Sequence, residues 1–509
     1  MTARQREIHR ERRWEAAAAA AVAVALVLRI LHAFFTERFN PLAGELQLDA
    51  ATYDRWARAI ASGGDAGPTT LMQSPLYPWF LSLLYRIFGA SLAAVRYAQA
   101  ALGAATCALV VSSARRLFES WAVAAVAGVV VALYAPLIFY EGVLVPATLI
   151  VFLNALFVAV LAGGAGPPPA RRLVAAGIIL GLAIAANPMS VVIIPFVALH
   201  LAVASPRTVR TVARRWLAAA VGLVLALAPF TARNALRTGE LIPLTTGGGI
   251  NFYIGNNANA NGFYAVPSYL GRSLGGTPEE QSIVMQTLAS EVAGTQLSQS
   301  ETSRFWLRAG LDYIRSEPRR WGALLWDKFR FFWNDYERAN VESFYFHRRF
   351  PGVLRLPLAT FGLLMPLGLL GLFLTRSRSR GLWLLYGGVL TYLLGALAFY
   401  VLARYRLPVV VFLAPFAGAA AVELVRLASS RRFAELALSL AALALLAFFS
   451  NARVARDTPV GVSGNLTRLG NAYVARGDST KAVGAYREAL ERNPRNEAAR
   501  AALSRLGAE

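Results

Sequence analysis

The sequence predicts an all-α membrane protein with about eleven transmembrane helices, extracytoplasmic loops that carry interfacial helices, and a C-terminal helical hairpin. Hydrophobic residues make up 56% of the 509 residues and charged residues only 16%, whereas ordinary soluble domains are about 25% charged. The apolar residues also occur in blocks of roughly 20, the length that crosses a bilayer. The tail from 463 to 496, by contrast, is charged and rich in alanine, which indicates a separate soluble element.

The apolar blocks define the expected spans. They lie near residues 16–35, 92–112, 120–135, 143–162, 173–186, 188–204, 216–232, 356–375, 382–401, 407–426 and 434–450. Five arginines precede the first block, as in a signal peptide. The block is long and no small-residue cleavage motif follows it, so we expect a retained first helix.

Arginines in the short loops predict the orientation. They occur in alternate loops, at Arg115/Arg116, Arg171/Arg172, Arg376/Arg378/Arg380 and Arg431/Arg432. The short loops near 134–143 and 187–188 contain neither lysine nor arginine. Because lysine and arginine favour the cytoplasmic side, we expect a cytoplasmic N-terminus and two long outer segments, 36–91 and 233–355. The C-terminus is then extracytoplasmic.

Composition also disfavours several classes of function. The net charge of +22 is carried almost entirely by arginine, but its short clusters between apolar blocks indicate membrane orientation, so no nucleic-acid partner is expected. A single cysteine excludes an internal disulfide, and the four histidines lack zinc-ligand spacing. The spans lack central Asp, Glu or Lys, which disfavours an ion-coupled transporter.

Three stretches of the outer segments predict interfacial helices. In residues 50–62 the apolar residues Tyr53, Trp56 and Ile60 recur at helical spacing. Residues 76–89 and 302–336 are rich in aromatic residues. Such amphipathic helices lie in the plane of a membrane surface.

Asp49 is the leading candidate for chemistry. It stands directly before the helix expected at 50–62. One interpretation is structural, because Asp is a favoured N-cap and suits the positive end of the helix dipole. The other is a catalytic carboxylate, and the residues alone leave both open.

Cations at the outer face are candidates for binding an anion. Arg404 and Arg406 lie in a very short outer loop, Arg233 and Asn234 begin the second outer segment, and Lys328 and Arg330 flank an aromatic cluster. Such cations either extend to lipid headgroups or grip an anion, which arginine does with two parallel hydrogen bonds. Residues 247–264, rich in Gly and Asn, form either an irregular outer loop or a backbone approach to a polar ligand.

The tail has the spacing of a tetratricopeptide repeat. Its small and large positions are filled by Leu466, Leu469, Gly470, Tyr473, Ala482, Tyr486, Ala489 and Pro494. One repeat cannot bury its own face, because about three are needed for independent stability. We therefore expect residues 463–509 to dock on the outer segments or on a protein partner, and not to catalyse.

Several segments together resemble a known family. They are LDAATYDRWARAIASGG (48–64), SPLYPWFLSLLYRIFG (74–89), VRYAQAALGAATCALV (95–110), Arg233-Asn234 followed by GGGINFYIGNN, and RYRLP (404–408). In this order they resemble the GT-C superfamily of membrane glycosyltransferases, and within it the protein O-mannosyltransferases and lipid A aminoarabinose transferases. The resemblance covers about residues 1–450, which places a transferase domain at 1–455.

The resemblance implies a function. It implies inverting transfer of a sugar from a polyprenyl-phosphate-linked donor to a lipid, glycan or protein acceptor, outside the bacterial cytoplasmic membrane. It implies Asp49 as general base, with substrate contacts from Tyr53, Arg233, Asn234, Lys328, Arg330, Arg404 and Arg406. It assigns no metal ligand and leaves a divalent metal open.

The chain also departs from the family pattern. Ala50 stands where a second acid often follows, Pro146-Ala147-Thr148 lacks a usual acid, and Ala186-Asn187-Pro188 lacks a usual arginine. The acceptor and the local anion contacts therefore stay open. The alternatives are a ligase or oligosaccharyltransferase-type enzyme that moves a larger glycan, a non-enzymatic scaffold that presents the repeat, and a transporter.

Overall fold

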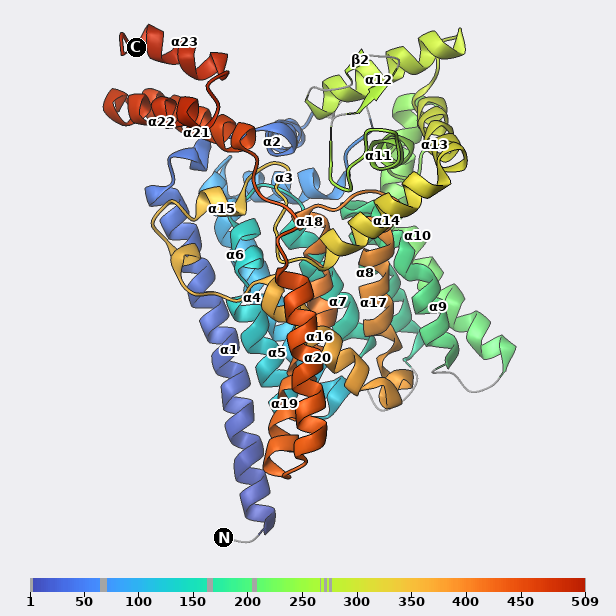
Figure 1. Cartoon of the computed structure of the whole chain (residues 1–509). Coiled ribbons are helices and arrows are strands. Elements are labelled where there is room, and N and C mark those ends of the chain that lie inside the picture. Colours follow the sequence, from blue (N-terminus) through green and yellow to red (C-terminus); the bar gives the residue numbers. More distant parts are fainter. Residues whose placement is uncertain are drawn as a thin grey trace.

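The computed structural model describes residues 3–64, 71–162, 168–203, 208–265, 267–269, 272–273 and 277–508. Within this part the chain is helical except for loops and one small hairpin, in which β1 (Ser268–Tyr269) pairs antiparallel with β2 (Arg272–Ser273). The predicted all-α fold is confirmed (Figure 1).

A bundle of long helices occupies the lower two thirds of Figure 1. A helix lies at each of the predicted spans: α1 (Ala3–Phe39), α4 (Leu92–Phe118), α5 (Trp121–Leu133), α7 (Ala147–Leu161), α8 (Ala170–Ala186), α9 (Ile194–Val203, after the 3-10 turn η2, Pro188–Ile193), α10 (Val209–Thr238), α16 (Phe361–Leu374), α17 (Ser379–Ala398), α19 (Val409–Ser429) and α20 (Phe433–Asn451). By length and composition, 6 helices of the described chain can each cross a membrane, and shorter apolar helices accompany them. The chain is thus a polytopic membrane protein.

The bundle helices pack closely through small residues. Helices α8 and α10 run parallel and meet at Gly177 and Gly222, where an added Cβ would overlap the carbonyl oxygens of Ala219 and Val174 respectively. Small residues are common at such contacts, because apolar side chains gain little by leaving lipid and close backbone packing supplies the attraction.

The long segments between the spans gather at one end of the bundle. At the top of Figure 1 they include η1 (Pro41–Gly44), α2 (Leu48–Ala61), α3 (Leu76–Phe88), α11 (Gly247–Gly255), α12 (Pro278–Ala293), α13 (Gln299–Ser316), α14 (Pro318–Trp333) and α15 (Phe344–His347). Four short elements also connect the longer helices: α6 (Ala135–Glu141), η3 (Val353–Arg355), η4 (Arg376–Arg378) and α18 (Ala403–Arg406). The N-terminus lies at the opposite end from the C-terminus (Figure 1).

Two of the predicted interfacial helices form as expected, and the third is divided. Helices α2 and α3 pack together, with the rings of Tyr53 and Tyr77 in edge contact at 5.3 Å. The stretch expected at 302–336 consists of α13 and α14, which meet at Glu317 and Pro318. Proline has no N–H for an intrahelical hydrogen bond and disfavours helical backbone before it, so it begins a new helix.

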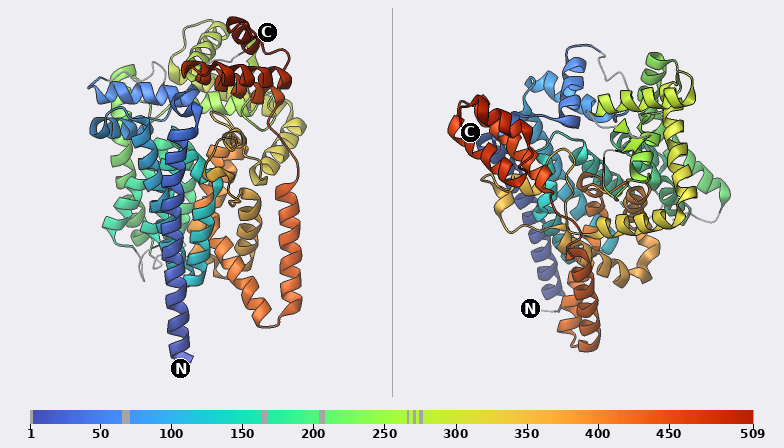
Figure 2. Two further views of the ribbon diagram at one scale, coloured as in Figure 1. Left: turned by 90° about the vertical axis from the view of Figure 1, so that its left-hand side faces the viewer. Right: turned by 45° about the horizontal axis from the view of Figure 1, so that its top comes forward.

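The tail folds as the predicted helical hairpin. Helices α21 (Pro459–Ala475) and α22 (Ser479–Arg492) pack against each other, and α23 (Glu497–Arg505) follows. Gly470 allows close approach, because an added Cβ would overlap the buried ring of Tyr486. In Figure 2 the hairpin lies at the same end of the molecule as the outer helices.

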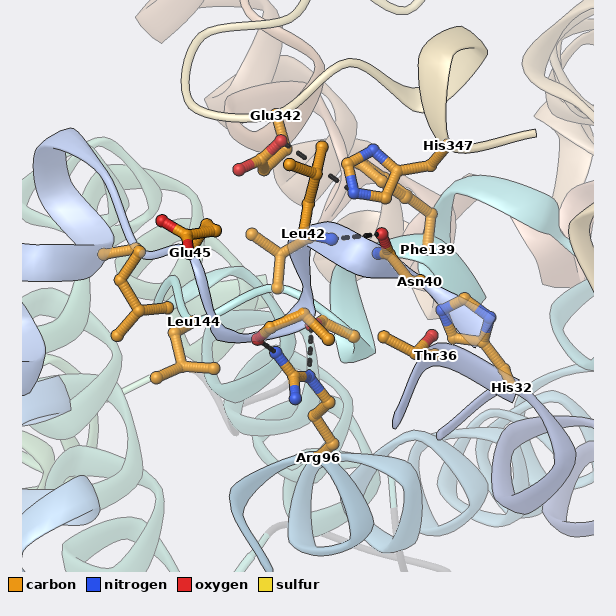
Figure 3. Close-up of a pocket in the computed structure, with 15 residues that line it drawn as sticks. His32, Thr36, Asn40, Leu42, Glu45, Arg96, Phe139, Leu144, Glu342 and His347 are labelled. Atoms are coloured by element: carbon orange, nitrogen blue, oxygen red, sulfur yellow. Dashed lines mark hydrogen bonds and ion pairs between the residues drawn. The ribbon is translucent and has the colours of Figure 1, made fainter. Parts of the chain in front are cut away.

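The repeat docks on the outer segments of its own chain. Leu42 of η1 and Phe346 of α15 belong to the same apolar cluster as Leu466 of α21. Leu42 also lines a small cavity of about 40 Å³, shown in Figure 3. There the Leu42 amide donates to Asn40 Oδ1 at 2.9 Å.

Candidate functional site

A cavity of about 480 Å³ lies where the upper ends of the bundle helices meet α2, α11 and α12. This volume is within the range of sites for small ligands. Its described wall consists of Leu48, Asp49, Tyr53, Met72, Gln73, Ser74, Pro146, Ala147, Ile150, Ala186, Asn187, Pro188, Met189, Thr245, Gly247, Gly248, Asn251, Tyr264, Pro278, Gln281, Arg338, Ala339, Asn340, Phe399, Tyr400, Arg404 and Tyr405. One wall is thus apolar and formed by bundle helices, and the other is rich in amides and tyrosines.

Asp49 and Arg404 form an ion pair in this cavity. Asp49 Oδ2 lies 2.6 Å from Arg404 Nη2, and the two side chains are only 15% and 10% exposed. Asp49 Oδ1 accepts a hydrogen bond from Gln73 Nε2 at 3.1 Å. The structure therefore brings together the leading acidic candidate and one of the predicted outer-face arginines.

The backbone before Asp49 determines its position. Gln47 is extended, and Leu48 has a φ of +48°, in the left-handed region that residues other than glycine rarely adopt. Asp49 falls within the first turn of α2, and Gln47 is the N-cap residue. The carboxylate therefore does not cap the helix but contacts Arg404, although it still benefits from the positive end of the helix dipole.

Tyrosines and amides surround the carboxylate. Tyr53, one turn after Asp49, is buried, and burial together with the Asp49 charge raises the pKa of its phenol, which stays protonated at neutral pH. Tyr400 donates a hydrogen bond to Asn251 Oδ1 at 2.6 Å, and Tyr264 donates to Gln281 Oε1 at 3.0 Å. Such a wall offers hydrogen bonds to a polyhydroxyl ligand.

Three buried polar atoms in the cavity wall have no hydrogen-bond partner within the described protein. They are Gln73 Oε1, Asn187 Nδ2 and Arg404 Nε. A buried polar atom left unpaired costs about 1–3 kcal/mol. The residues of the wall thus leave one acceptor and two donors unpaired beside the cavity.

Several helix N-termini also face the cavity. The first residues of α2, α7, α11 and α12 belong to its wall. Helix N-termini attract anions through their unpaired N–H groups and their dipoles. One of these helices, α11, occupies residues 247–255, where an irregular loop was one of our two expectations. At Gly248 in this helix, an added Cβ would meet no atom within 4 Å.

The structure places two other predicted cations away from the described cavity wall. Arg406 is buried, lies 2.8 Å from Glu337 Oε1, and donates to the carbonyl oxygen of Phe332 at 3.0 Å. Lys328 is buried, with Nζ 3.2 Å from Asn256 Oδ1 and 3.0 Å from the Leu397 carbonyl oxygen. Burial lowers the pKa of Lys328 to about 7. These partners of both cations belong to the protein itself, and the expected role of the two cations in binding a ligand stays a prediction.

The remaining predicted contacts also lie outside the wall. Arg233 lies over the ring of Trp56, 5.3 Å from its centroid. Asn234 is buried and donates to the Ile242 carbonyl oxygen at 3.1 Å, which closes the turn after α10. Arg330 is 39% exposed and lies 3.7 Å from Asp327. Their position at the outer end was predictable, but the direction of each side chain was not.

Other residues of the wall were missed from sequence. Arg338 lies over the ring of Phe263 at 5.1 Å and supplies a second cation. It belongs to an irregular segment without periodicity, so no pattern separated it from other outer arginines. Asn187 stood out only as a departure from the family pattern, and Gln73 gave no signal.

The wall supplies few metal ligands. Among the described residues no group of three His, Cys, Asp or Glu side chains has the arrangement of a metal site. Asp49 is the one carboxylate in the described cavity wall. Glu141, the nearest acid to the Pro146-Ala147-Thr148 departure, is buried 2.9 Å from Arg29 Nε instead.

Comparison with known proteins assigns two parts of the chain. Residues 72–232 match the family described as dolichyl-phosphate-mannose-protein mannosyltransferase, and residues 464–506 match the tetratricopeptide repeat. No curated protein sequence matches the chain.

Solved structures that are similar to this chain include those of two proteins. The apo oligosaccharyltransferase of Archaeoglobus fulgidus has 14% identity and a TM-score of 0.47, covering 89% of this chain and 57% of that chain. ArnT from Cupriavidus metallidurans has 17% identity and a TM-score of 0.45 in the apo state, covering 93% and 75%. Bound to undecaprenyl phosphate, ArnT has 16% identity and a TM-score of 0.37, covering 81% and 79%.

The chain spans little more than half the length of the archaeal oligosaccharyltransferase. The first match contains the segments 74–89 and 95–110 of the resemblance noted from sequence, and the second contains most of the predicted repeat. Residues 72–232 of this chain are therefore similar to the dolichyl-phosphate-mannose-protein mannosyltransferase family, and residues 464–506 are similar to a tetratricopeptide repeat.

Proposed function

We propose that this protein is an inverting membrane glycosyltransferase that moves a sugar from a polyprenyl-phosphate-linked donor to an extracytoplasmic acceptor, with Asp49 as general base. The observation that carries the proposal is the Asp49–Arg404 pair, with its 2.6 Å contact, in the wall of a cavity between bundle and outer helices. We place this cavity at the outer face of the bacterial cytoplasmic membrane, because the arginine-rich loops lie at the other end of the bundle.

The reaction needs one base and a cationic site for the leaving group. Asp49 takes the proton from the acceptor nucleophile as the new bond to the anomeric carbon forms. The bond from that carbon to the phosphate oxygen breaks, and its electron pair stays on the phosphate. Attack on the face opposite the phosphate inverts the anomeric configuration. No general acid is required, because phosphate is a good leaving group.

Two arginines and the helix N-termini suit the phosphate that is released. Arg404 and Arg338 both belong to the cavity wall, and Arg404 Nε is one of the unpaired donors. Preorganised donors and cations stabilise charge that develops in the transition state. A phosphate that binds the Arg404 guanidinium also replaces Asp49 Oδ2 as its partner, so that this oxygen can receive the proton of the acceptor.

The apolar wall suits the lipid part of the donor. Pro146, Ile150, Ala186 and Met189 come from the bundle helices or their ends and line the membrane side of the cavity. Each buried CH₂ of a lipid chain contributes about 0.8 kcal/mol. A cavity of about 480 Å³ favours a single sugar phosphate over a larger glycan.

Asp49→Asn tests the proposal, because it keeps the size of the side chain and removes the base. We expect transfer from a panel of undecaprenyl-phosphate hexoses and pentoses to fall by about 100-fold or more, with normal membrane expression. Asp54→Asn is the matched control, since Asp54 is on the same helix and pairs with Arg58 at 2.8 Å. Transfer by Asp49→Asn within a few-fold of wild type would exclude this role.

A further inference from the structure

The segment between α14 and α16 contacts both the cavity and the repeat. We call its residues 334–350, which include α15, the connecting segment. Its residues Arg338, Ala339 and Asn340 belong to the cavity wall. Only two residues after Asn340, Glu342 contacts the repeat, so the same short stretch of backbone reaches both.

Ion pairs fasten the connecting segment to the repeat. Glu342 Oε1 lies 2.9 Å from Arg468 Nη2, and Oε2 lies 3.3 Å from Nη1. Both side chains are largely buried, so this pair is less screened by solvent than a surface pair. A second two-bond pair joins Arg349 to Glu488, with distances of 2.9 and 2.6 Å.

One carboxylate holds both ends of the stretch that lines the cavity. Asp457, two residues before α21, accepts from the Tyr336 hydroxyl at 2.6 Å through Oδ1 and from Ser343 Oγ at 2.9 Å through Oδ2. Tyr336 precedes Arg338 and Ser343 follows Asn340. The Asp457 carboxylate therefore closes residues 336–343 into a loop whose middle faces the cavity.

This loop is tied to the two elements that carry the ion pair. The Ala403 amide, beside Arg404, donates to the Arg338 carbonyl oxygen at 3.1 Å. Gln47 Nε2, shortly before Asp49, donates to the carbonyl oxygen of Val341. The loop is thus anchored beside both members of the ion pair, which fixes the position of Arg338 relative to them.

The repeat also holds the chain that leads into α2. Arg476 Nη2 donates to the carbonyl oxygens of Asn40 at 3.3 Å and Pro41 at 3.1 Å. Arg468 Nη2 donates to the Glu45 carbonyl oxygen at 3.3 Å. The repeat itself contributes no residue to the described cavity wall, so any effect on the site passes through these segments.

We propose that Asp457 and Arg468 are positioning residues for the donor site: by fixing residues 336–343, they hold Arg338 where it meets the phosphate of the lipid carrier. This inference rests on the proposed function. The repeat is accordingly a brace for the site, and a protein bound to the repeat would alter donor affinity by shifting this loop.

The test measures binding of undecaprenyl phosphate to the full chain in detergent. Asp457→Ala, and separately Arg468→Ala, is expected to weaken binding roughly five- to tenfold. Combined with Arg338→Ala, either substitution should add little to the loss caused by Arg338→Ala alone, because all act through one side chain. The exchange Arg468→Glu with Glu342→Arg should restore binding. Asp478→Ala is the control, since Asp478 pairs only locally with Lys481 at 2.7 Å.

A second measurement needs no ligand. Amide hydrogen exchange at residues 336–343 should become faster in Asp457→Ala and stay as in wild type in Asp478→Ala. An exchange rate at residues 336–343 that is unchanged in Asp457→Ala would overturn the proposed brace. So would double variants whose loss of affinity equals the product of the losses in the two single variants. Failure of the wild type to bind undecaprenyl phosphate, together with faster exchange in Asp457→Ala, would instead refute the proposed donor and leave the brace standing.

Discussion

Arg406 forms a buried ion pair with Glu337, in which Nη2 lies 2.8 Å from Oε1 and both side chains are at most 3% exposed. Arg404, two residues earlier, pairs with Asp49 in the cavity. The two arginines therefore have different roles, and their substitution should have different effects. Arg406→Ala leaves Glu337 buried and unpaired, and should lower the free energy of unfolding by about 3–5 kcal/mol.

Arg404→Ala should instead weaken the binding of undecaprenyl phosphate by about tenfold or more, because a hydrogen bond to a charged group contributes about 1.5–3 kcal/mol. Thermal unfolding in detergent and titration with undecaprenyl phosphate measure the two effects separately. Normal binding by Arg404→Ala would show that this arginine serves the fold and not the ligand.

Lys328 predicts a pH dependence of stability. Burial lowers the pKa of Lys328 from 10.5 to about 7. Between these values the unfolded chain binds the proton and the folded chain does not, so the free energy of unfolding contributed by this group rises with pH. Wild type should therefore gain stability relative to Lys328→Met between pH 7 and about pH 9.5. Unfolding curves of the two proteins that shift in parallel would contradict this.

Gly248 offers a way to fill the cavity without disturbing the fold. Because an added Cβ meets no atom within 4 Å, Gly248→Leu should leave thermal unfolding unchanged or raise its midpoint, since glycine disfavours helix. Binding of undecaprenyl phosphate should fall severalfold. Gly484→Leu is the matched control, because Gly484 lies in α22 with equally open surroundings. Equal binding by the two variants would place the ligand elsewhere.

Reporter fusions test the orientation. Fusions after Arg215 should be active as cytoplasmic reporters, and fusions near Gly262 or Gly477 as extracytoplasmic ones. A cytoplasmic signal at Gly477 would contradict the odd number of spans and place the repeat on the other side.

The bundle could be predicted from sequence because composition and length alone identify spans. The hairpin could be predicted because small and large residues, such as Gly470 and Tyr486, are complementary at fixed spacing. The sequence also drew attention to Asp49 and Arg404, which lie together in the structure. Their catalytic and binding roles stay predictions.

The direction of individual cations could not be read in the same way. Arg404 and Arg406 share one four-residue helix, yet they face different partners because tertiary packing determines what lies on each side. Arg338 lines the cavity but was not among the predicted residues, since an irregular segment offers no periodicity from which a face can be inferred. The sequence thus indicated which end of the molecule carries the candidate site, but not all the residues that line it.

The pairing of Asp49 with Arg404 has a consequence for biosynthesis. Roughly 350 residues separate them, which at bacterial synthesis rates corresponds to about 20–70 s. During that interval α2 waits at the membrane surface with its acid unpartnered, while most of the later spans are inserted. Any delay or error in inserting the C-terminal spans would therefore yield a chain that resides in the membrane but lacks half of its ion pair.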